Sequence, residues 1–154
     1  MRRMRDFTSS PTNLVGFAVS TMNARLLDNV ELVEQLSTLG WPVVIVNQHT
    51  TQESKLDPEA EGMNRPHMRV IQSAQLGLSH SRNQAMDALK KLSVQWAVLC
   101  DDDVTLDLGE CAALAAWLEG DAPTSSWDNV GAVTTRLMKS RTEPWRAYQK
   151  ATSH

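Results

Sequence analysis

The side chains best suited to chemistry are three consecutive aspartates, Asp101, Asp102 and Asp103, which directly follow an apolar run. Because side chains alternate along an extended chain, we expect Asp101 and Asp103 to point one way and Asp102 the other. Two carboxylates on one side form part of a site for Mg²⁺ or Mn²⁺, which waters and substrate phosphates complete. A metal held there would neutralise a departing diphosphate. The alternative is a solvated acidic turn that caps the next helix.

A second group of polar residues lies in the segment Gly-Leu-Ser-His-Ser-Arg-Asn at residues 77–83. Gly77 permits a backbone turn that other residues avoid. We expect Ser79 to cap a helix and Arg82 to lie in its first turn, where backbone N–H groups favour anions. The Arg82 guanidinium could bind phosphate, stack on a base or pair with an aspartate. The alternative is a capped helix whose Arg82 pairs with a surface acid.

The apolar pattern predicts strands and helices in alternation as the scaffold for these residues. Short apolar runs predict strands, and apolar residues three and four apart predict helices. The expected strands are 14–19, 43–46, 68–71, 96–100 and 130–134; the expected helices are 26–39, one after Ser79 that carries Leu92, and 108–118. This order predicts an α/β fold with an open, mostly parallel sheet and helices on both faces.

Ligands of such sheets bind beyond the carboxyl ends of the strands. Asn23 follows the first expected strand, Asn47 and Gln48 follow the second, and the aspartates follow the fourth. The expected ligand site is therefore at this edge, beside a polar loop at residues 47–66.

In this order the segments resemble the family-two glycosyltransferases, which share the Rossmann-like GT-A fold. Four segments carry the resemblance: Thr-Met-Asn-Ala-Arg at 21–25, Val-Asn-Gln-His-Thr at 46–50, residues 77–83, and the strand that ends in the aspartates at 101–103. The resemblance covers roughly residues 14–137, and it implies the nucleotide-sugar-binding half of such an enzyme.

The resemblance implies a nucleoside-diphosphate sugar, expected to be of the UDP type, and a divalent metal, Mn²⁺ or Mg²⁺. Asp103 would ligate the metal directly, and Asp101 would approach the ribose or the metal and its waters. Arg82 would lie near the base or the diphosphate. The residues expected to contact the nucleotide are Thr21, Asn23, Arg25, Asn47, Gln48, Gly77, Arg82, Asp101 and Asp102.

The chain departs from the family pattern in two places. Asn47 and Gln48 stand where the family has aspartates, and amides donate hydrogen bonds as well as accept them. The family's catalytic base and acceptor site come after the last expected strand, where this sequence has only residues 135–154. Glu143 is the candidate base in that segment, and the chain looks truncated to the donor half.

Two functions fit these residues. In an inverting sugar transfer, a general base takes the acceptor's hydroxyl proton while metal-bound diphosphate leaves. The alternative is a non-catalytic nucleotide or nucleotide-sugar binder, or a subunit without an acceptor domain. A nucleotidyltransferase ranks last, because such enzymes usually carry a glycine-rich loop after the first strand and residues 20–25 contain no glycine.

Composition narrows the partners and the compartment. A net charge of −3 argues against nucleic acid, which needs a basic face. No apolar run approaches the roughly 20 residues of a membrane span. Without a signal peptide, and with two cysteines read as reduced, we expect a cytoplasmic protein. We expect a flexible leader at 1–12, the binding domain at 13–138, and a tail at 139–154 that could form a homodimer interface.

Overall fold

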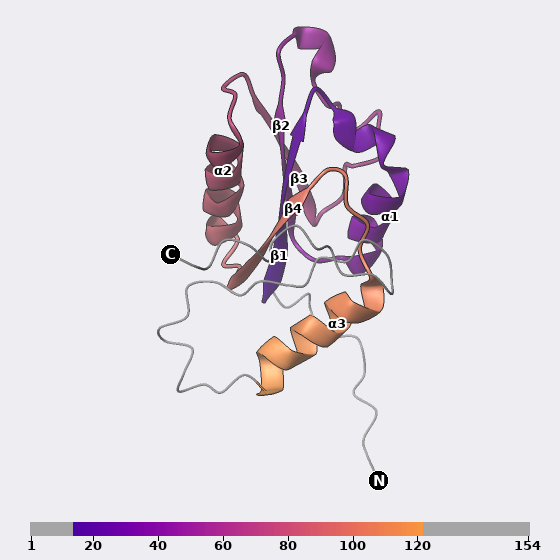
Figure 1. The fold of residues 1–154 in the computed structure, drawn as a ribbon, viewed down its shortest axis with the longest axis vertical. Helices are drawn as coiled ribbons and strands as arrows, with labels where there is room; N and C mark the ends of the chain where they lie inside the picture. The colour runs from indigo at the N-terminus through magenta and orange to yellow at the C-terminus, as the bar shows by residue number, and fades with distance from the viewer. Residues whose placement is uncertain (1–13, 122–154) are drawn as a thin grey trace, which may run out of the picture. The chain divides into compact units, whose positions relative to one another are not determined.

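The computed structural model describes residues 14–121, and these form an α/β fold around one sheet (Figure 1). The sheet has four strands, all parallel, in the order β3-β2-β1-β4. Their bounds are β1 (Val15–Met22), β2 (Val43–Gln48), β3 (Met68–Ser73) and β4 (Trp96–Asp101). The predicted fold class, an open parallel sheet with helices, is confirmed.

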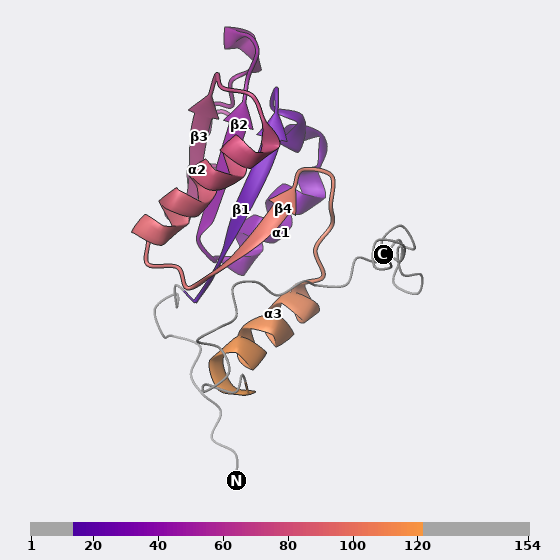
Figure 2. The ribbon, with the colours of Figure 1, turned by 60° about the vertical axis from the view of Figure 1, so that its left-hand side comes forward.

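Helices α1 (Val30–Leu39) and α2 (Leu78–Lys91) lie on opposite sides of this sheet (Figures 1 and 2). The chain moves from β1 to β2 in one direction across the sheet and from β3 to β4 in the other. Because such crossovers are right-handed, the two connecting helices fall on opposite faces. The sheet is therefore covered on both faces, as its apolar strands require.

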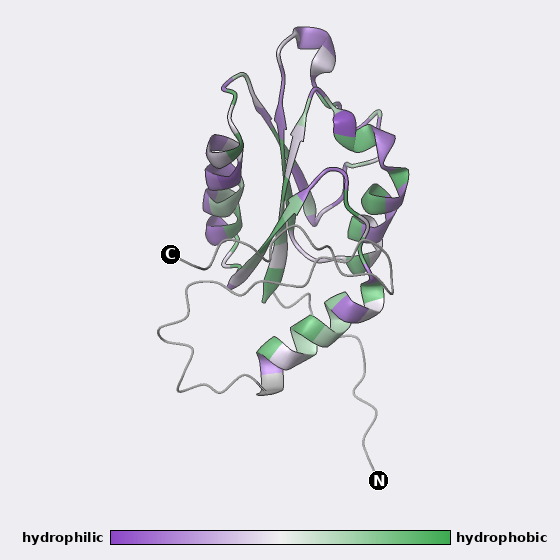
Figure 3. Cartoon of the chain, in the orientation of Figure 1, coloured by the Kyte–Doolittle hydropathy of each residue, from purple (hydrophilic) through white to green (hydrophobic). Residues whose placement is uncertain are grey.

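The two central strands are apolar on both faces and supply most of the core. On the α1 face, Phe17 and Val19 pack with Leu32 and Leu36 of the helix. The opposite face holds a second cluster with the members Ala18, Val44, Val46, Ala85, Ala88 and Leu89. In Figure 3 the central strands are mostly hydrophobic, and hydrophilic residues lie on α2 away from the sheet.

The edge strand β4 is less buried than its apolar sequence suggests. Cys100 is buried, but Leu99 is 51% exposed, although its neighbour across the strand pair, Ala18, is buried. Helix α2 packs mainly on β1 and β2, so among the described elements it covers little of β4. Among the described strands, β4 and β3 are the edges of the sheet.

The elements differ from the expected bounds at the turns. The expected helix at 26–39 is split into a 3₁₀ turn, η1 (Arg25–Asp28), and α1, because Asn29 caps α1 by accepting from the Leu32 N–H at 3.2 Å. The cap of α2 is Gly77 at φ 127°, not Ser79. Helix α3 (Leu108–Ala116) is capped by Asp107 and continues into a π-helical turn, η3 (Trp117–Asp121).

Four expectations concern residues outside 14–121: the leader at 1–12, the strand at 130–134, the candidate base Glu143, and the tail at 139–154 with its interface. They stay predictions. Within the described part of the chain, no helix is both long enough and apolar enough to cross a membrane.

Candidate functional site

The carboxyl ends of β1, β2 and β4 bring together polar residues that are far apart in the sequence. Thr21 on β1 lies level with Asn47 on β2, and Ser20 lies level with Asp101 on β4. The aspartates and Asn23 thus share the sheet edge that the strand order predicted for ligands.

The turn after β1 is strained. Asn23 and Ala24 have φ values of 50° and 60°, a left-handed conformation that costs a residue with a Cβ about 1–2 kcal/mol. Hydrogen bonds from β2 hold this turn: the Asn23 N–H donates to the Gln48 carbonyl at 2.7 Å, and the Ala24 N–H donates to Asn47 Oδ1 at 2.9 Å. Backbone strain of this kind concentrates at functional sites.

Asp102 is fastened to the β1 side of the site. Its Oδ2 accepts from the Thr21 hydroxyl at 2.7 Å, and its Oδ1 lies 3.5 Å from Nη2 of Arg25. The Asp102 side chain is 11% exposed and that of Arg25 is 61% exposed. Thr21 also accepts from the Leu26 N–H at 2.9 Å, so one hydroxyl joins the 3₁₀ turn to the carboxylate.

The chain beyond the aspartates is held along α1. Asn29 Nδ2 donates to the carbonyls of Asp102 and Val104 at 3.2 and 2.8 Å. Gln35 exchanges two hydrogen bonds of 2.8 Å with the backbone of Leu106. The cap residue of α1, Asn29, and Gln35 within the helix therefore fix the path that follows the acidic triplet.

Asp101 interacts with the other side of the sheet. Its Oδ1 lies 3.1 Å from Nη2 of Arg82 in the first turns of α2. The Ser81 hydroxyl bonds to the Ser20 hydroxyl at 2.9 Å in the core, which fixes this end of α2 on β1. The Arg82 and Asp101 side chains are 35% and 51% exposed, so the pair contributes little stability and its arginine stays accessible.

Asp103 lies with Asp102 rather than with Asp101. The two line a pocket of about 370 Å³ together with Arg25, Asp28, Asn29 and Thr105, and Asp101 is not part of its lining. The expected pairing of Asp101 with Asp103 was therefore wrong. Strand β4 ends at Asp101 and the chain turns at the next two residues, so the alternation of an extended strand no longer applies.

The oxygen atoms of this pocket are of the kind that Mg²⁺ and Mn²⁺ accept. Asp103 is exposed and makes no hydrogen bond or ion pair with the described residues. Asp102 lies beside it, although Thr21 and Arg25 already engage its carboxylate. Within residues 14–121, no three His, Cys, Asp or Glu side chains converge as a metal-binding group. The acidic triplet thus offers two carboxylates to this pocket, a number that suffices where waters and phosphates complete the shell.

Asn47 and Gln48, which the sequence placed at the nucleotide, are buried and engaged with the protein. Asn47 is 0% exposed, and its Nδ2 donates to the Ser54 carbonyl and to Gln72 Oε1, both at 2.9 Å. Gln48 is 4% exposed, and its Nε2 donates to the carbonyls of Gln75 and Gly77 at 3.1 and 2.8 Å. Both amides thus hold the loops that surround the site. Gly77 contributes its backbone carbonyl, which accepts the hydrogen bond from Gln48.

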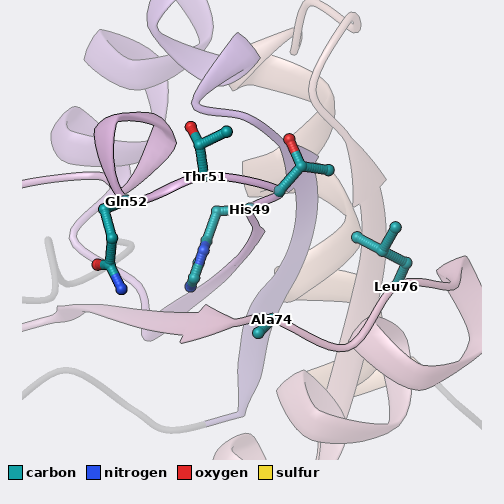
Figure 4. Close-up of a pocket in the computed structure, with 6 residues that line it drawn as sticks. His49, Thr51, Gln52, Ala74 and Leu76 are labelled. Atoms are coloured by element: carbon teal, nitrogen blue, oxygen red, sulfur yellow. The ribbon is translucent and has the colours of Figure 1, made fainter.

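A further pocket of about 520 Å³ lies between the loops after β2 and β3 (Figure 4). The residues that line it are His49, Thr50, Thr51, Gln52, Ala74 and Leu76. Sequence analysis included His49 and Thr50 in the segment 46–50 but named none of these six residues as a ligand contact, because the approach of the two loops to each other depends on the fold.

Both cysteine thiols are poor nucleophiles in this environment. Burial raises the pKa of Cys100 to about 12, and the negative charge of Asp101 adds to the shift. Burial also raises the pKa of Cys111, with smaller effects from Asp107 and Glu110. Neither thiol is poised for nucleophilic catalysis.

The sequence matches no protein-family model, and searches among curated proteins and solved structures found no significant match.

The raised Cys100 pKa predicts a loss of stability at high pH. The unfolded thiol ionises above its ordinary pKa of 9.0 while the folded thiol stays protonated to about 12. The unfolded state therefore binds fewer protons in this window, and the free energy of unfolding falls by at most about 1 kcal/mol per pH unit. Denaturant titrations from pH 8 upward, compared with Cys100→Ala, measure it. Equal slopes for both proteins would contradict the assignment.

The buried position of Asn47 predicts that an aspartate is not tolerated there. Asn47→Asp removes the donor to Ser54 and Gln72 and buries a carboxylate, so the free energy of unfolding falls by about 2 kcal/mol or more. Asn83→Asp makes the same chemical change on the exposed face of α2 and should alter stability by less than about 0.5 kcal/mol. Equal stability of the two variants in denaturant titrations would show that the buried hydrogen bonds of Asn47 do not stabilise the fold.

Proposed function

We propose that this protein binds a nucleoside-diphosphate sugar at the carboxyl edge of its sheet, with a divalent metal between the diphosphate and the acidic triplet. One observation carries the proposal: Arg25, Arg82 and the three aspartates gather where β1 and β4 end, beside a strained turn. Exposed guanidinium groups suit phosphate oxygens. Carboxylates next to them suit a metal ion that bridges to the same phosphates.

Each charged residue has a role in this proposal. Arg82 lies at the start of α2, where its guanidinium can turn from Asp101 to a phosphate without leaving the edge. Arg25 can do the same from the Asp102 side. Asp103, with no partner among the described residues, is the carboxylate most readily offered to Mn²⁺ or Mg²⁺, and Asp102 is the second.

The reaction that fits this arrangement is an inverting transfer of the sugar. An acceptor hydroxyl would attack the anomeric carbon as the bond to the diphosphate breaks, and a general base would take the hydroxyl proton. The metal would neutralise the charge that collects on the diphosphate. The two arginines would stabilise the same charge from the protein side.

Binding without transfer is the second candidate. It requires the same charged edge and no general base. The described residues favour it in one respect: two of the three carboxylates of the triplet, Asp101 and Asp102, are engaged by an arginine, and a base must be free to accept a proton. Release of sugar or of nucleoside diphosphate from UDP-glucose or UDP-N-acetylglucosamine, measured with the full chain, distinguishes a transferase from a binder.

A thermal-shift experiment tests the shared donor site. A ligand that binds only the folded state adds about 2.7 kcal/mol of stability at a hundredfold excess over its Kd. UDP with Mn²⁺ should therefore raise the Tm by more than the sum of the two separate shifts. Asp103→Ala should lose this synergy and keep the Tm of the free protein, because the side chain is exposed.

Asp107→Ala is an unsuitable control, because that carboxylate caps α3. Asp87→Ala is a better one: Asp87 is an exposed aspartate on α2, away from the edge, and should leave the synergy intact. The proposal fails if no nucleoside diphosphate shifts the wild-type Tm at millimolar concentration with either metal.

A further inference from the structure

The pocket between the loops after β2 and β3 differs in character from the charged edge. Its lining among residues 14–121 contains an imidazole, two hydroxyl groups and an amide, together with the apolar side chains of Ala74 and Leu76, but no Asp, Glu, Lys or Arg. Figure 4 shows His49 and Gln52 extending from one loop and Leu76 standing on the other. Leu76 is 51% exposed. Hydrogen-bonding side chains beside an apolar surface suit a flat, uncharged, hydrogen-bonding ring better than a phosphate.

The loop at residues 49–52 is held in place before any ligand binds. The His49 N–H donates to the Ser73 carbonyl at 2.9 Å, which ties this loop to the end of β3. Thr51 and Ser54 share a hydroxyl hydrogen bond of 2.6 Å, and the buried amide of Asn47 donates to the Ser54 carbonyl. A loop fixed in this way loses little freedom when a ligand binds, and this lowers the cost of recognition.

The pocket is connected to the charged edge through Asn23. Asn23 Oδ1 accepts from both the N–H and the hydroxyl of Thr50, at 2.9 and 3.1 Å, and Asn23 is itself exposed in the strained turn. The pocket lies over β2 and β3, whereas the arginines and aspartates lie near the ends of β1 and β4. The midpoint between β2 and β3 lies two strand spacings, roughly 10 Å, from the midpoint between β1 and β4. A ribose and a diphosphate can bridge that distance.

We infer that this pocket takes the base of the nucleoside diphosphate, and that His49 and Gln52 set the base preference. The inference rests on the proposed function. Asn47 and Gln48 cannot take this role, because both are buried with their N–H groups donated to the protein. They act as positioning residues, which shape the two loops and leave recognition to the side chains those loops present.

Calorimetric titrations of the full chain with UDP, CDP, ADP and GDP in Mn²⁺ test this inference, with inorganic pyrophosphate as the probe without a base. For wild type, the Kd of the most weakly bound nucleotide should exceed that of the preferred one by about tenfold or more, because a base that leaves hydrogen-bonding groups of the pocket unpaired binds more weakly. His49→Ala and Gln52→Ala should each weaken the preferred nucleotide by about tenfold and level the ranking. Their affinity for pyrophosphate should stay within about twofold of wild type.

Two control variants separate the pocket from its surroundings. Glu53→Ala changes the next exposed side chain on the same short turn, which is not part of the pocket lining, and should keep the wild-type ranking of bases. Arg82→Ala should weaken all four nucleotides and pyrophosphate together and also preserve the ranking, because it acts on the phosphates.

The outcomes distinguish the two proposals. If neither the nucleotides nor pyrophosphate bind wild type, the proposed function fails and the pocket assignment fails with it. If the nucleotides bind but wild type shows no base preference, only the assignment of the pocket is overturned. The same holds if wild type has a base preference and the His49→Ala and Gln52→Ala variants retain it. Loss of pyrophosphate binding in these two variants would likewise contradict the assignment, because the pocket would then serve the phosphates.

Discussion

The side-chain amide of Asn47 forms hydrogen bonds with three separate parts of the chain from a position with no solvent exposure. Its oxygen holds the strained turn after β1 through Ala24, and its nitrogen holds Ser54 in the loop after β2 and Gln72 on β3. The polar groups at this edge need such partners, because an unsatisfied buried group costs about 1–3 kcal/mol. This turn leads from Thr21 on β1 to Arg25, and both residues contact Asp102, so the geometry of the Asp102 side of the charged edge depends on this one buried side chain.

Around this fixed centre, the charges are arranged in two pairs on opposite sides of the sheet. Arg82 reaches Asp101 from α2, and Arg25 reaches Asp102 from the 3₁₀ turn before α1. The Arg82–Asp101 pair is exposed and adds little to stability, so Arg82 can change partners at small cost. Arg25 is 61% exposed, and the Thr21 hydroxyl still donates to Asp102 when Arg25 leaves. A diphosphate with its metal offers each arginine a stronger partner, and the carboxylates that they leave are suited to the cation. In this account, the same residues compensate one another's charge in the free protein and bind the ligand in the complex.

Sequence patterns predicted the sheet well because its strands are nearly continuous apolar runs, and the aspartates fell at the ligand edge because β4 ends abruptly in charge. Three features were beyond such patterns. Asp102 rather than Asp101 accompanies Asp103, because the chain turns there and strand alternation stops. Asn47 and Gln48 are buried, because two loops fold over them through contacts distant in sequence. The partial exposure of β4 follows from where α2 packs across the sheet, and no local pattern encodes that choice.

The central claim is that a nucleoside diphosphate and a metal meet at the carboxyl edge of the sheet. Paramagnetic broadening of backbone amide signals by a small amount of Mn²⁺, with saturating UDP and the full chain, tests this claim directly because the broadening falls steeply with distance from the ion. The account predicts that the amides of Asp102, Asp103 and Arg25 broaden first, while those at the opposite ends of the strands, such as Val15 and Met68, stay sharp. Broadening centred on the opposite edge, or spread evenly over the domain, would contradict it.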